Sequence, residues 1–182
     1  ASTHHPGRRA TRHPPPLFPT LRFAMAATHV VPATGIVLSD DSAWLPLDQI
    51  YGFLSQETHW ARGLPRAVFD RSIANSLCFA AYRLNDDGTH GDLVGFARVI
   101  TDRATFAYLC DVFVLPEWRG KGVSHALMDF LREHPELQSL RRTVLVTTGA
   151  DWLYRKHGFT DVPEGIGFMQ LHRPNIYKTA AA

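Results

Sequence analysis

Residues 112–124, VFVLPEWRGKGVS, carry the clearest chemical signal in the sequence. An apolar run leads through a loop with two glycines, Gly120 and Gly122, directly into a helical pattern. Glycine lets the main chain approach a ligand closely, while the unpaired N–H groups and the dipole at a helix start attract an anion. Because Arg119 and Lys121 add positive charge at the same place, the stretch predicts a phosphate or pyrophosphate site.

Two other phosphate-binding loops do not fit this spacing. A Walker loop requires G-x-x-x-x-G-K-[ST], which is absent, and the dinucleotide pattern G-x-G-x-x-G fails because His125 stands at the third glycine position. The remaining alternative is a plain glycine turn that leads into a helix and binds no ligand.

Strand and helix patterns alternate ahead of this loop. Residues 35–39 predict a short strand, and apolar residues at helical spacing in 47–54 and 65–73 predict two helices. Three further strand patterns, joined by short turns, predict an antiparallel meander: 77–84, 93–100 and 105–114.

A different arrangement follows the loop. Residues 122–134 predict a helix with one buried face, and residues 142–147 predict a strand. Because a helix joins them, this strand should run parallel to 105–114. A short helix over 150–157 and a last strand over 168–172 complete an α/β sheet that mixes antiparallel and parallel strands.

The composition is that of an ordinary globular protein without membrane spans. Hydrophobic residues make up 45% and charged residues 20% of 182 residues, and no apolar stretch approaches the roughly 18 residues of a membrane helix. The net charge is +2, but Arg8, Arg9, Arg12 and Arg22 stand in the acid-free residues 1–39, which leaves about −2 for the rest. This balance argues against nucleic acid as a partner.

The first 24 residues are rich in Pro, Arg and His and predict a disordered or leader tail before a single domain over residues 25–182. An upstream extension before a start at Met25 is favoured over organellar targeting. Cys78 and Cys110 lie in strand patterns and predict buried structural thiols in a reducing cytoplasm. Neither C-x-x-C nor H-E-x-x-H occurs, so we expect no metal.

Two motifs resemble those of the GNAT superfamily of acyl-CoA-dependent N-acetyltransferases. Residues 119–124 (RGKGVS) resemble the signature [RQ]-x-x-G-x-[GA], with Ser124 as the one departure. Residues 150–159 resemble A-x-x-x-Y-x-x-x-G-F, although Thr147 stands where many members have Asn. The resemblance covers residues 33–172. It implies an α/β fold with a mixed sheet of about six strands, whose parallel pair splays around CoA, flanked by about four helices.

The resemblance also implies roles for residues of this sequence. The backbone of Val112, Phe113 and Val114 would hold the acetyl carbonyl and pantetheine arm of acetyl-CoA, where a strand N–H stabilises the growing negative charge of the thioester oxygen. The pyrophosphate would be bound by Arg119, Gly120, Lys121, Gly122, Val123 and Ser124.

Direct attack by an amine requires a base. An alkyl ammonium with a pKa near 10.4 is neutral in only about one molecule in a thousand at pH 7. Asp111 is the first candidate base, since it lies in an apolar strand beside the expected acetyl site, where partial burial favours proton uptake. The alternative for Asp111 is an ion pair with a nearby arginine. Glu57 is the second candidate carboxylate to face the substrate, and its own alternative is a solvated loop carboxylate.

The departing CoA thiolate requires an acid. A phenol with a pKa near 10 is matched to a thiol of pKa about 8.5, so Tyr154 is the predicted donor. The alternative for Tyr154 is a core aromatic, because position 154 belongs to the apolar stripe of its helix.

Trp60 and Glu57 lie in the loop expected to form the acceptor side, where cation–π contact and charge would hold an amine. We favour a small-molecule amine over a peptide or protein acceptor, with a non-catalytic acyl-CoA-binding module as the third alternative. The sequence leaves a homodimer open.

Overall fold

The computed structural model describes residues 26–177, so the predicted tail over residues 1–24 lies outside the described residues. Within them, six strands form one sheet and four α-helices flank it. The strands are β1 (Thr28–Val31), β2 (Ile36–Ser39), β3 (Leu77–Leu84), β4 (His90–Thr101), β5 (Phe106–Val114) and β6 (Arg142–Leu145). The helices are α1 (Leu47–Gly52), which continues into a π-helical turn (Phe53–Glu57), α2 (Arg66–Ala74), α3 (Val123–Glu133) and α4 (Asp151–Lys156).

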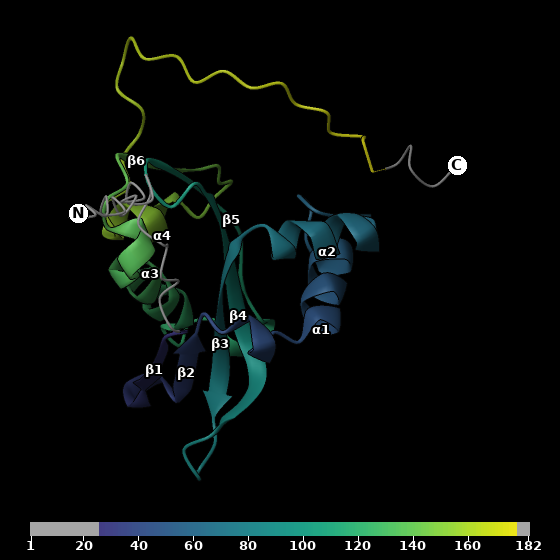
Figure 1. Cartoon of the computed structure of the whole chain (residues 1–182), viewed down its shortest axis with the longest axis vertical. Coiled ribbons are helices and arrows are strands. Elements are labelled where there is room, and N and C mark those ends of the chain that lie inside the picture. The colour runs from purple at the N-terminus through teal and green to yellow at the C-terminus, as the bar shows by residue number, and fades with distance from the viewer. Residues whose placement is uncertain (1–25, 178–182) are drawn as a thin grey trace, which may run out of the picture.

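The strands follow one another across the sheet in chain order, from β1 to β6. Every neighbouring pair from β1 to β5 is antiparallel, and β5 and β6 run parallel. The predicted meander and the predicted parallel pair are therefore confirmed. Figure 1 shows α3 and α4 on one side of the sheet and α1 and α2 on the other.

Two apolar clusters, one on each face, hold these layers together. Adjacent residues of β4 belong to different clusters, as strand alternation requires: Ala97 lies with the α3 cluster and Phe96 with the α1–α2 cluster. On α3 the buried residues recur at helical spacing, including Val123, Leu127 and Leu131. This stripe packs α3 against the sheet and so fixes the position of the loop that precedes it.

The first strand of the sheet was not predicted from the sequence. Residues 28–30 are exposed, so β1 lacks the apolar alternation that marks a strand. The strand is held by pairing with β2 and by Asp40, whose Oδ1 accepts the Ala27 N–H at 2.5 Å. Tertiary contacts therefore define this strand.

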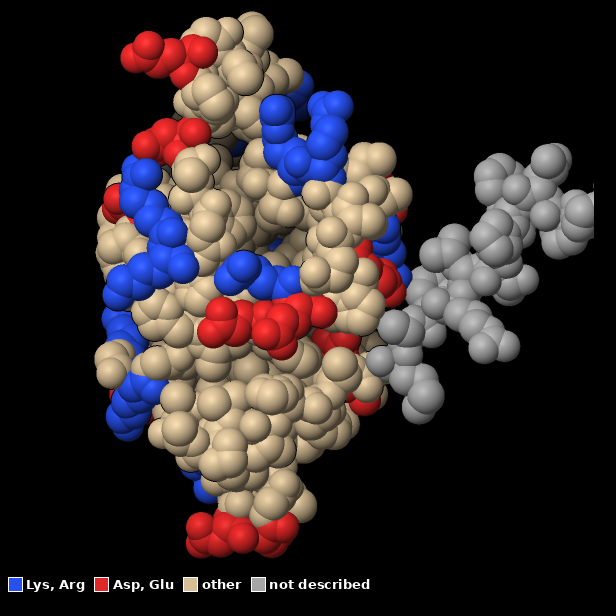
Figure 2. Space-filling view, turned by 90° about the vertical axis from the view of Figure 1, so that its left-hand side faces the viewer, with Lys and Arg blue, Asp and Glu red and all other residues tan. Residues whose placement is uncertain are grey.

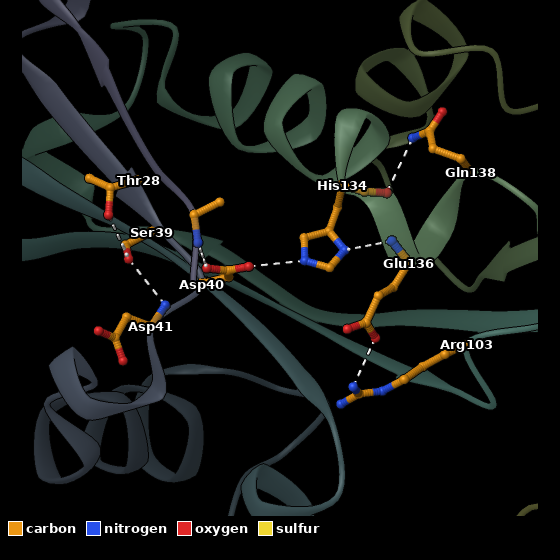
Figure 3. Close-up of polar contacts among 9 residues, drawn as sticks. Thr28, Ser39, Asp40, Asp41, Arg103, His134, Glu136 and Gln138 are labelled. Carbon is orange, nitrogen blue, oxygen red and sulfur yellow. Dashed lines mark hydrogen bonds and ion pairs between the residues drawn. The ribbon is translucent and has the colours of Figure 1, made fainter. Parts of the chain in front are cut away.

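Asp40 also links β2 to the end of α3 (Figure 3). Its Oδ2 lies 2.9 Å from Nε2 of His134, whose side chain is 4% exposed. The Glu136 N–H donates to His134 Nδ1 at 3.3 Å, so Nε2 is the protonated nitrogen of the neutral ring and donates to Asp40. Arg103 bonds the Glu136 carboxylate at 2.8 Å, which joins the β4–β5 turn to the same network.

The predicted last strand over residues 168–172 is wrong. These residues have no regular secondary structure, and Phe168, Met169 and Leu171 are 60%, 93% and 86% exposed. The physical reason lies in the sequence just before it, because Pro163 and the glycines around 165–167 disfavour strand pairing. In Figure 1 this yellow segment runs away from β6.

An irregularity in β5 shapes the functional end of the sheet. The register passes from Arg98 opposite Cys110 to Phe96 opposite Phe113, so two residues of β5, one of them Asp111, oppose one residue of β4. Asp111 has a positive φ of 52°, and such a β-bulge increases the twist of the strand. Pairing with β6 covers only residues 106–109 of β5. Beyond the bulge, the β6 side of β5 has no strand partner among residues 26–177.

Candidate active site

A cavity of about 530 Å³ lies where β5 parts from β6. Its walls come from the end of β5, the loop and first turn of α3, the start of α4 and the π-helical turn after α1. The predicted site residues that line it are Glu57, Trp60, Val112, Phe113, Val114, Arg119, Gly120, Gly122, Val123, Ser124 and Tyr154. The fold thus brings together all the predicted site residues except Asp111 and Lys121.

The glycine loop forms one wall as an open cradle of main-chain donors. Gly120 and Gly122 have φ of 72° and 82°, a conformation that L side chains rarely adopt. The first helical bond of α3 runs from the Ala126 N–H to the Gly122 oxygen at 3.0 Å, and no side chain caps the helix. The N–H groups of Val123 and Ser124 therefore have no helical acceptor and are available to an anion.

The end of β5 forms the second wall. The Leu115 N–H bonds to the Val94 oxygen of β4 at 2.9 Å. Because successive residues of a strand direct their N–H groups to opposite sides, the N–H and C=O of Val114 face the gap beside β6. The Val114 oxygen accepts Nε of Arg119 at 3.1 Å, which fixes the cradle against the strand end.

Lys121 lies beside the cavity. Its Nζ is 4.9 Å from the centre of the Trp118 ring, and Trp118 lines the cavity. The cation–π contact with Trp118 holds the positive charge of Lys121 at the rim of the cavity. Arg119 lies in the cavity wall itself.

Tyr154 of α4 lies both in the apolar core and in the cavity wall. Its residue is 9% exposed, it packs with the α3 cluster, and its ring lies 5.9 Å from that of Phe159. It also lines the cavity. Burial raises the pKa of its phenol, so Tyr154 carries its proton throughout the neutral range and can donate it.

Asp111 is bound by an arginine, as the ion-pair alternative predicted. Nε of Arg98 lies 2.7 Å from its carboxylate, and the two side chains are 12% and 13% exposed. Arg98 also bonds Oγ of Ser76 at 3.0 Å. Burial raises the pKa of the flanking Cys78 and Cys110 thiols to about 12, so both remain protonated and act as small apolar side chains.

The residues predicted for the acceptor side lie on the π-helical turn and the loop that follows it. Glu57 and Trp60 are exposed at the cavity mouth, Trp60 by 48%, and the His59 ring meets Trp60 edge to face at 5.0 Å. Phe53 stacks on Phe113 at 4.2 Å, which attaches the turn to β5. π-helical turns of this kind occur frequently at functional sites.

Eight lining residues were not predicted as site residues, among them Phe53, His125 and Trp152. His125 follows the signature directly, but in the sequence it served only to exclude a dinucleotide loop. Phe53 and Trp152 stand in the predicted helices 47–54 and 150–157, and nothing in their spacing marks them as site residues. Only the fold places them at the cavity.

A second cavity, of about 670 Å³, lies on the other side of α4 along β6. It shares Tyr154 with the first, and four arginines are among its lining residues: Arg132, Arg141, Arg142 and Arg155. Figure 2 shows this side of the molecule, hollowed in its upper half, with both basic and acidic side chains around the hollow. The face therefore carries mixed charge.

Among residues 26–177, no three His, Cys, Asp or Glu side chains lie close enough together to hold a metal ion. In the same residues, no helix has the length and apolar character needed to cross a membrane.

Comparisons with known proteins agree with this geometry. The acetyltransferase (GNAT) domain family matches residues 74–161. A candidate acetyltransferase of Gibberella zeae is 34% identical over 145 residues, which cover 70% of this chain and 81% of that protein. An uncharacterised N-acetyltransferase of Porphyra purpurea is 32% identical over 96 residues, 50% of this chain and 52% of that protein.

A solved structure is also similar. The crystal structure of a candidate GNAT acetyltransferase from Xanthomonas campestris pv. campestris has 46% sequence identity and a TM-score of 0.70, covering 78% of this chain and 96% of that one.

The last two strands of the mixed sheet run parallel and then part, and the free end of β5 shares one cavity with the glycine cradle. This arrangement is that of an acyltransferase that uses acyl-CoA. The chain belongs to the GNAT family of acetyltransferases.

Proposed function

We propose that this protein transfers the acetyl group of acetyl-CoA to the primary amine of a small molecule. One observation carries the proposal: a single cavity joins the unpaired end of β5 to the donor cradle at the start of α3. Acetyl-CoA matches these two surfaces: its thioester and pantetheine arm suit the unpaired end of β5, and its diphosphate suits the N–H groups of the cradle.

The cradle and the strand have separate tasks in binding acetyl-CoA. The free N–H groups of residues 120–124 receive the diphosphate, supported by the α3 dipole and by Arg119. The gap side of residues 112–114 receives the pantetheine arm and thioester. A main-chain N–H directed at the thioester oxygen stabilises the negative charge that develops there as the amine attacks.

Tyr154 is the proposed general acid. The amine nitrogen forms a bond to the acetyl carbon, the carbon–sulfur bond breaks, and the sulfur leaves as a thiolate. The Tyr154 phenol gives this sulfur its proton. Its position on the cavity wall and the burial that keeps it protonated both support the role.

Glu57 is the better supported of the two candidate bases. The Asp111 carboxylate already receives a charge-assisted hydrogen bond from Arg98 and does not line the cavity. Glu57 lines the cavity on the acceptor side, next to Trp60. A carboxylate there attracts the ammonium and receives its proton directly or through water.

A small acceptor fits the space better than a folded protein surface. The cavity has about 530 Å³ for both substrates, within the range typical of small-molecule sites. The N-acetyltransferase named among the relatives supports nitrogen as the acceptor atom. A peptide whose terminal amine alone enters the cavity is the second candidate, because Trp60 and Glu57 lie exposed at its mouth.

The test is an acceptor screen that follows thiol release from acetyl-CoA, with mass spectrometry of the products. We expect release with at least one free amine and transfer of one acetyl group to its nitrogen. Preference for peptides over free amines would favour the second candidate. Tight CoA binding without release for any amine or peptide would contradict the enzymatic proposal and leave a binding module.

The choice of base is tested by Glu57→Gln and Asp111→Asn. If Glu57 is the base, Glu57→Gln lowers kcat/KM by about 10²-fold, most strongly for amines of high pKa. Asp111→Asn should instead lower the free energy of unfolding, because it leaves Arg98 buried without its carboxylate. A pure loss of kcat in Asp111→Asn, at unchanged stability, would return the base role to Asp111.

A further inference from the structure

Three titratable side chains, linked by one hydrogen bond and one ion-pair contact, form a series that ends at the cavity. His125 Nδ1 lies 2.9 Å from Nε2 of His157, and His157 Nδ1 lies 3.1 Å from the Asp129 carboxylate. Asp129 and His125 are one turn apart on α3, and His157 caps the end of α4. His125 and its neighbour Trp152 line the cavity.

The positions of the protons in this series follow from Asp129, which forms its exposed end. The Asp129 carboxylate can only accept, so His157 Nδ1 carries a proton. Burial lowers the pKa of His157, whose side chain is 6% exposed, so the ring is neutral and its Nε2 accepts. His125 must therefore donate from Nδ1, and its Nε2 has no hydrogen-bond partner among residues 26–177.

The charged groups around His125 are mixed in sign. From α3, Asp129 and Arg132 both interact electrostatically with the ring of His157, the partner of His125. From α4, Lys156 lies 5.7 Å from the centre of the Trp152 ring that borders His125. From the cradle, Lys121 lies three residues before Ser124. Asp129 is the one anion in this group, and it reaches His125 only through His157.

We propose that His125 binds a phosphate of CoA through Nε2, and that His157 and Asp129 are positioning residues that fix its ring. The inference rests on the proposed function, since it assigns a further ligand to the same cofactor. His125 follows the cradle directly in the first turn of α3, so its free nitrogen lies at the diphosphate end of the cavity. An imidazolium there would donate from both nitrogens, to His157 and to a phosphate oxygen.

This assignment makes cofactor binding take up protons. A neutral His125 has no donor at Nε2 while Nδ1 donates to His157, so it must gain a proton to donate to phosphate. Binding of CoA at pH 7.5 should therefore consume part of one proton, which calorimetry in two buffers of different ionisation enthalpy measures. A residue that only packs α3 against α4 would not produce this signal.

The experiment compares CoA binding by the full chain and four variants. His172→Gln, in the exposed C-terminal segment, is the matched control. His125→Gln should weaken CoA binding about tenfold and abolish proton uptake. His125→Lys should retain most of the affinity, because the positive charge remains. His157→Gln should weaken binding by a smaller factor, about threefold, and Asp129→Asn by less, because the Asp129 side chain is 59% exposed.

Two further ligands locate the contact. Pantetheine, which lacks the phosphates, should bind the parent and His125→Gln equally. Dephospho-CoA should show the same tenfold difference as CoA if His125 contacts the diphosphate, and no difference if it contacts the 3′-phosphate; either result supports a phosphate ligand.

Unchanged CoA affinity and unchanged proton uptake in His125→Gln would overturn the proposal and leave the three side chains as a clamp between α3 and α4. Equal weakening of CoA and pantetheine would overturn it as well, since the effect would not depend on phosphate. Failure of the parent chain to bind CoA would instead contradict the proposed function itself.

Discussion

Tyr154 lies both in the core and in the cavity wall, and substitution separates these two roles. Removing only its hydroxyl in Tyr154→Phe leaves the packing against Phe159 and removes the proton donor. We predict that kcat falls by about 10²-fold or more while the KM for acetyl-CoA changes little. Steady-state kinetics with the best amine of the acceptor screen provide the measurement.

The matched control for Tyr154→Phe is Tyr108→Phe on β5, outside the cavity lining. It should leave kcat within about twofold of the parent. Full activity of Tyr154→Phe would assign that side chain to the core alone.

At the scale of single residues, the sequence predicted whatever depends on neighbours within about ten positions. The cradle over residues 119–124 and Tyr154 belong to short motifs, and it is the family resemblance of these motifs that predicts their roles. Asp111 shows the limit, because its partner Arg98 stands 13 residues earlier and meets it only through a β-bulge. His125 shows the same limit, since His157 is 32 residues away.

The cradle before α3 requires glycine for its backbone conformation, and this requirement gives an element-scale prediction. Gly122→Ala places a side chain at a φ of 82°, at a cost of about 1 kcal/mol. The new Cβ would lie 3.4 Å from Cγ2 of Thr34, an ordinary van der Waals contact, so the backbone conformation accounts for the cost. We predict that acetyl-CoA affinity falls at least tenfold, measured by calorimetric titration.

Gly88→Ala is the control, because Gly88 has a nearly equal φ of 81° in the distant β3–β4 turn. Both variants should lose similar stability, but only Gly122→Ala should lose affinity. Equal affinities in the two variants would show that the cradle conformation is not used for binding.

The network around His134 makes the edge of the sheet depend on α3 (Figure 3). His134→Ala removes the buried donor to Asp40 and the acceptor for the Glu136 N–H. We predict a loss of about 2–4 kcal/mol in the free energy of unfolding, measured with urea. His172→Ala in the exposed tail should lose less than about 0.5 kcal/mol.

A cost for His134→Ala no larger than that of the control would contradict the role of this network. The network also explains why β1 could not be predicted. Its residues carry no strand pattern of their own. Its start is held by the bond from the Ala27 N–H to Asp40, and Asp40 is in turn bound by His134, 94 positions later.

At the scale of the whole molecule, the Cys78 and Cys110 thiols make the free energy of unfolding fall at high pH, because the fold disfavours their ionised form. Burial raises the pKa of Cys78 and Cys110 from 9.0 to about 12. In the unfolded chain these thiols lose their protons near pH 9, so the stabilising contribution is complete below pH 9 and is lost as pH rises from 9 to 12. We predict a loss of more than about 1 kcal/mol between pH 8 and pH 10.5.

Urea unfolding at the two pH values, under reducing conditions, measures this loss. A variant with both Cys78→Ala and Cys110→Ala should show a smaller decline over the same interval. An identical decline in parent and variant would show that other groups cause the alkaline loss.

The fold as a whole was largely predictable, because the antiparallel meander, the parallel final pair and the helices that flank them each have a local periodicity. The C-terminal segment was not predictable in this way. The pattern in residues 168–172 indicates a preference for strand, but the segment pairs with no strand of the sheet. Whether a segment pairs depends on the length and reach of β6, four residues long, and the sequence of the segment itself does not contain that information.

The central claim is that the cavity at the unpaired end of β5, beside the glycine cradle, binds acetyl-CoA. Calorimetric titration of the purified chain with acetyl-CoA tests it directly. We predict saturable one-to-one binding that Gly122→Ala weakens at least tenfold. An absence of binding heat at several temperatures, or binding that is the same in Gly122→Ala as in the parent, would contradict it.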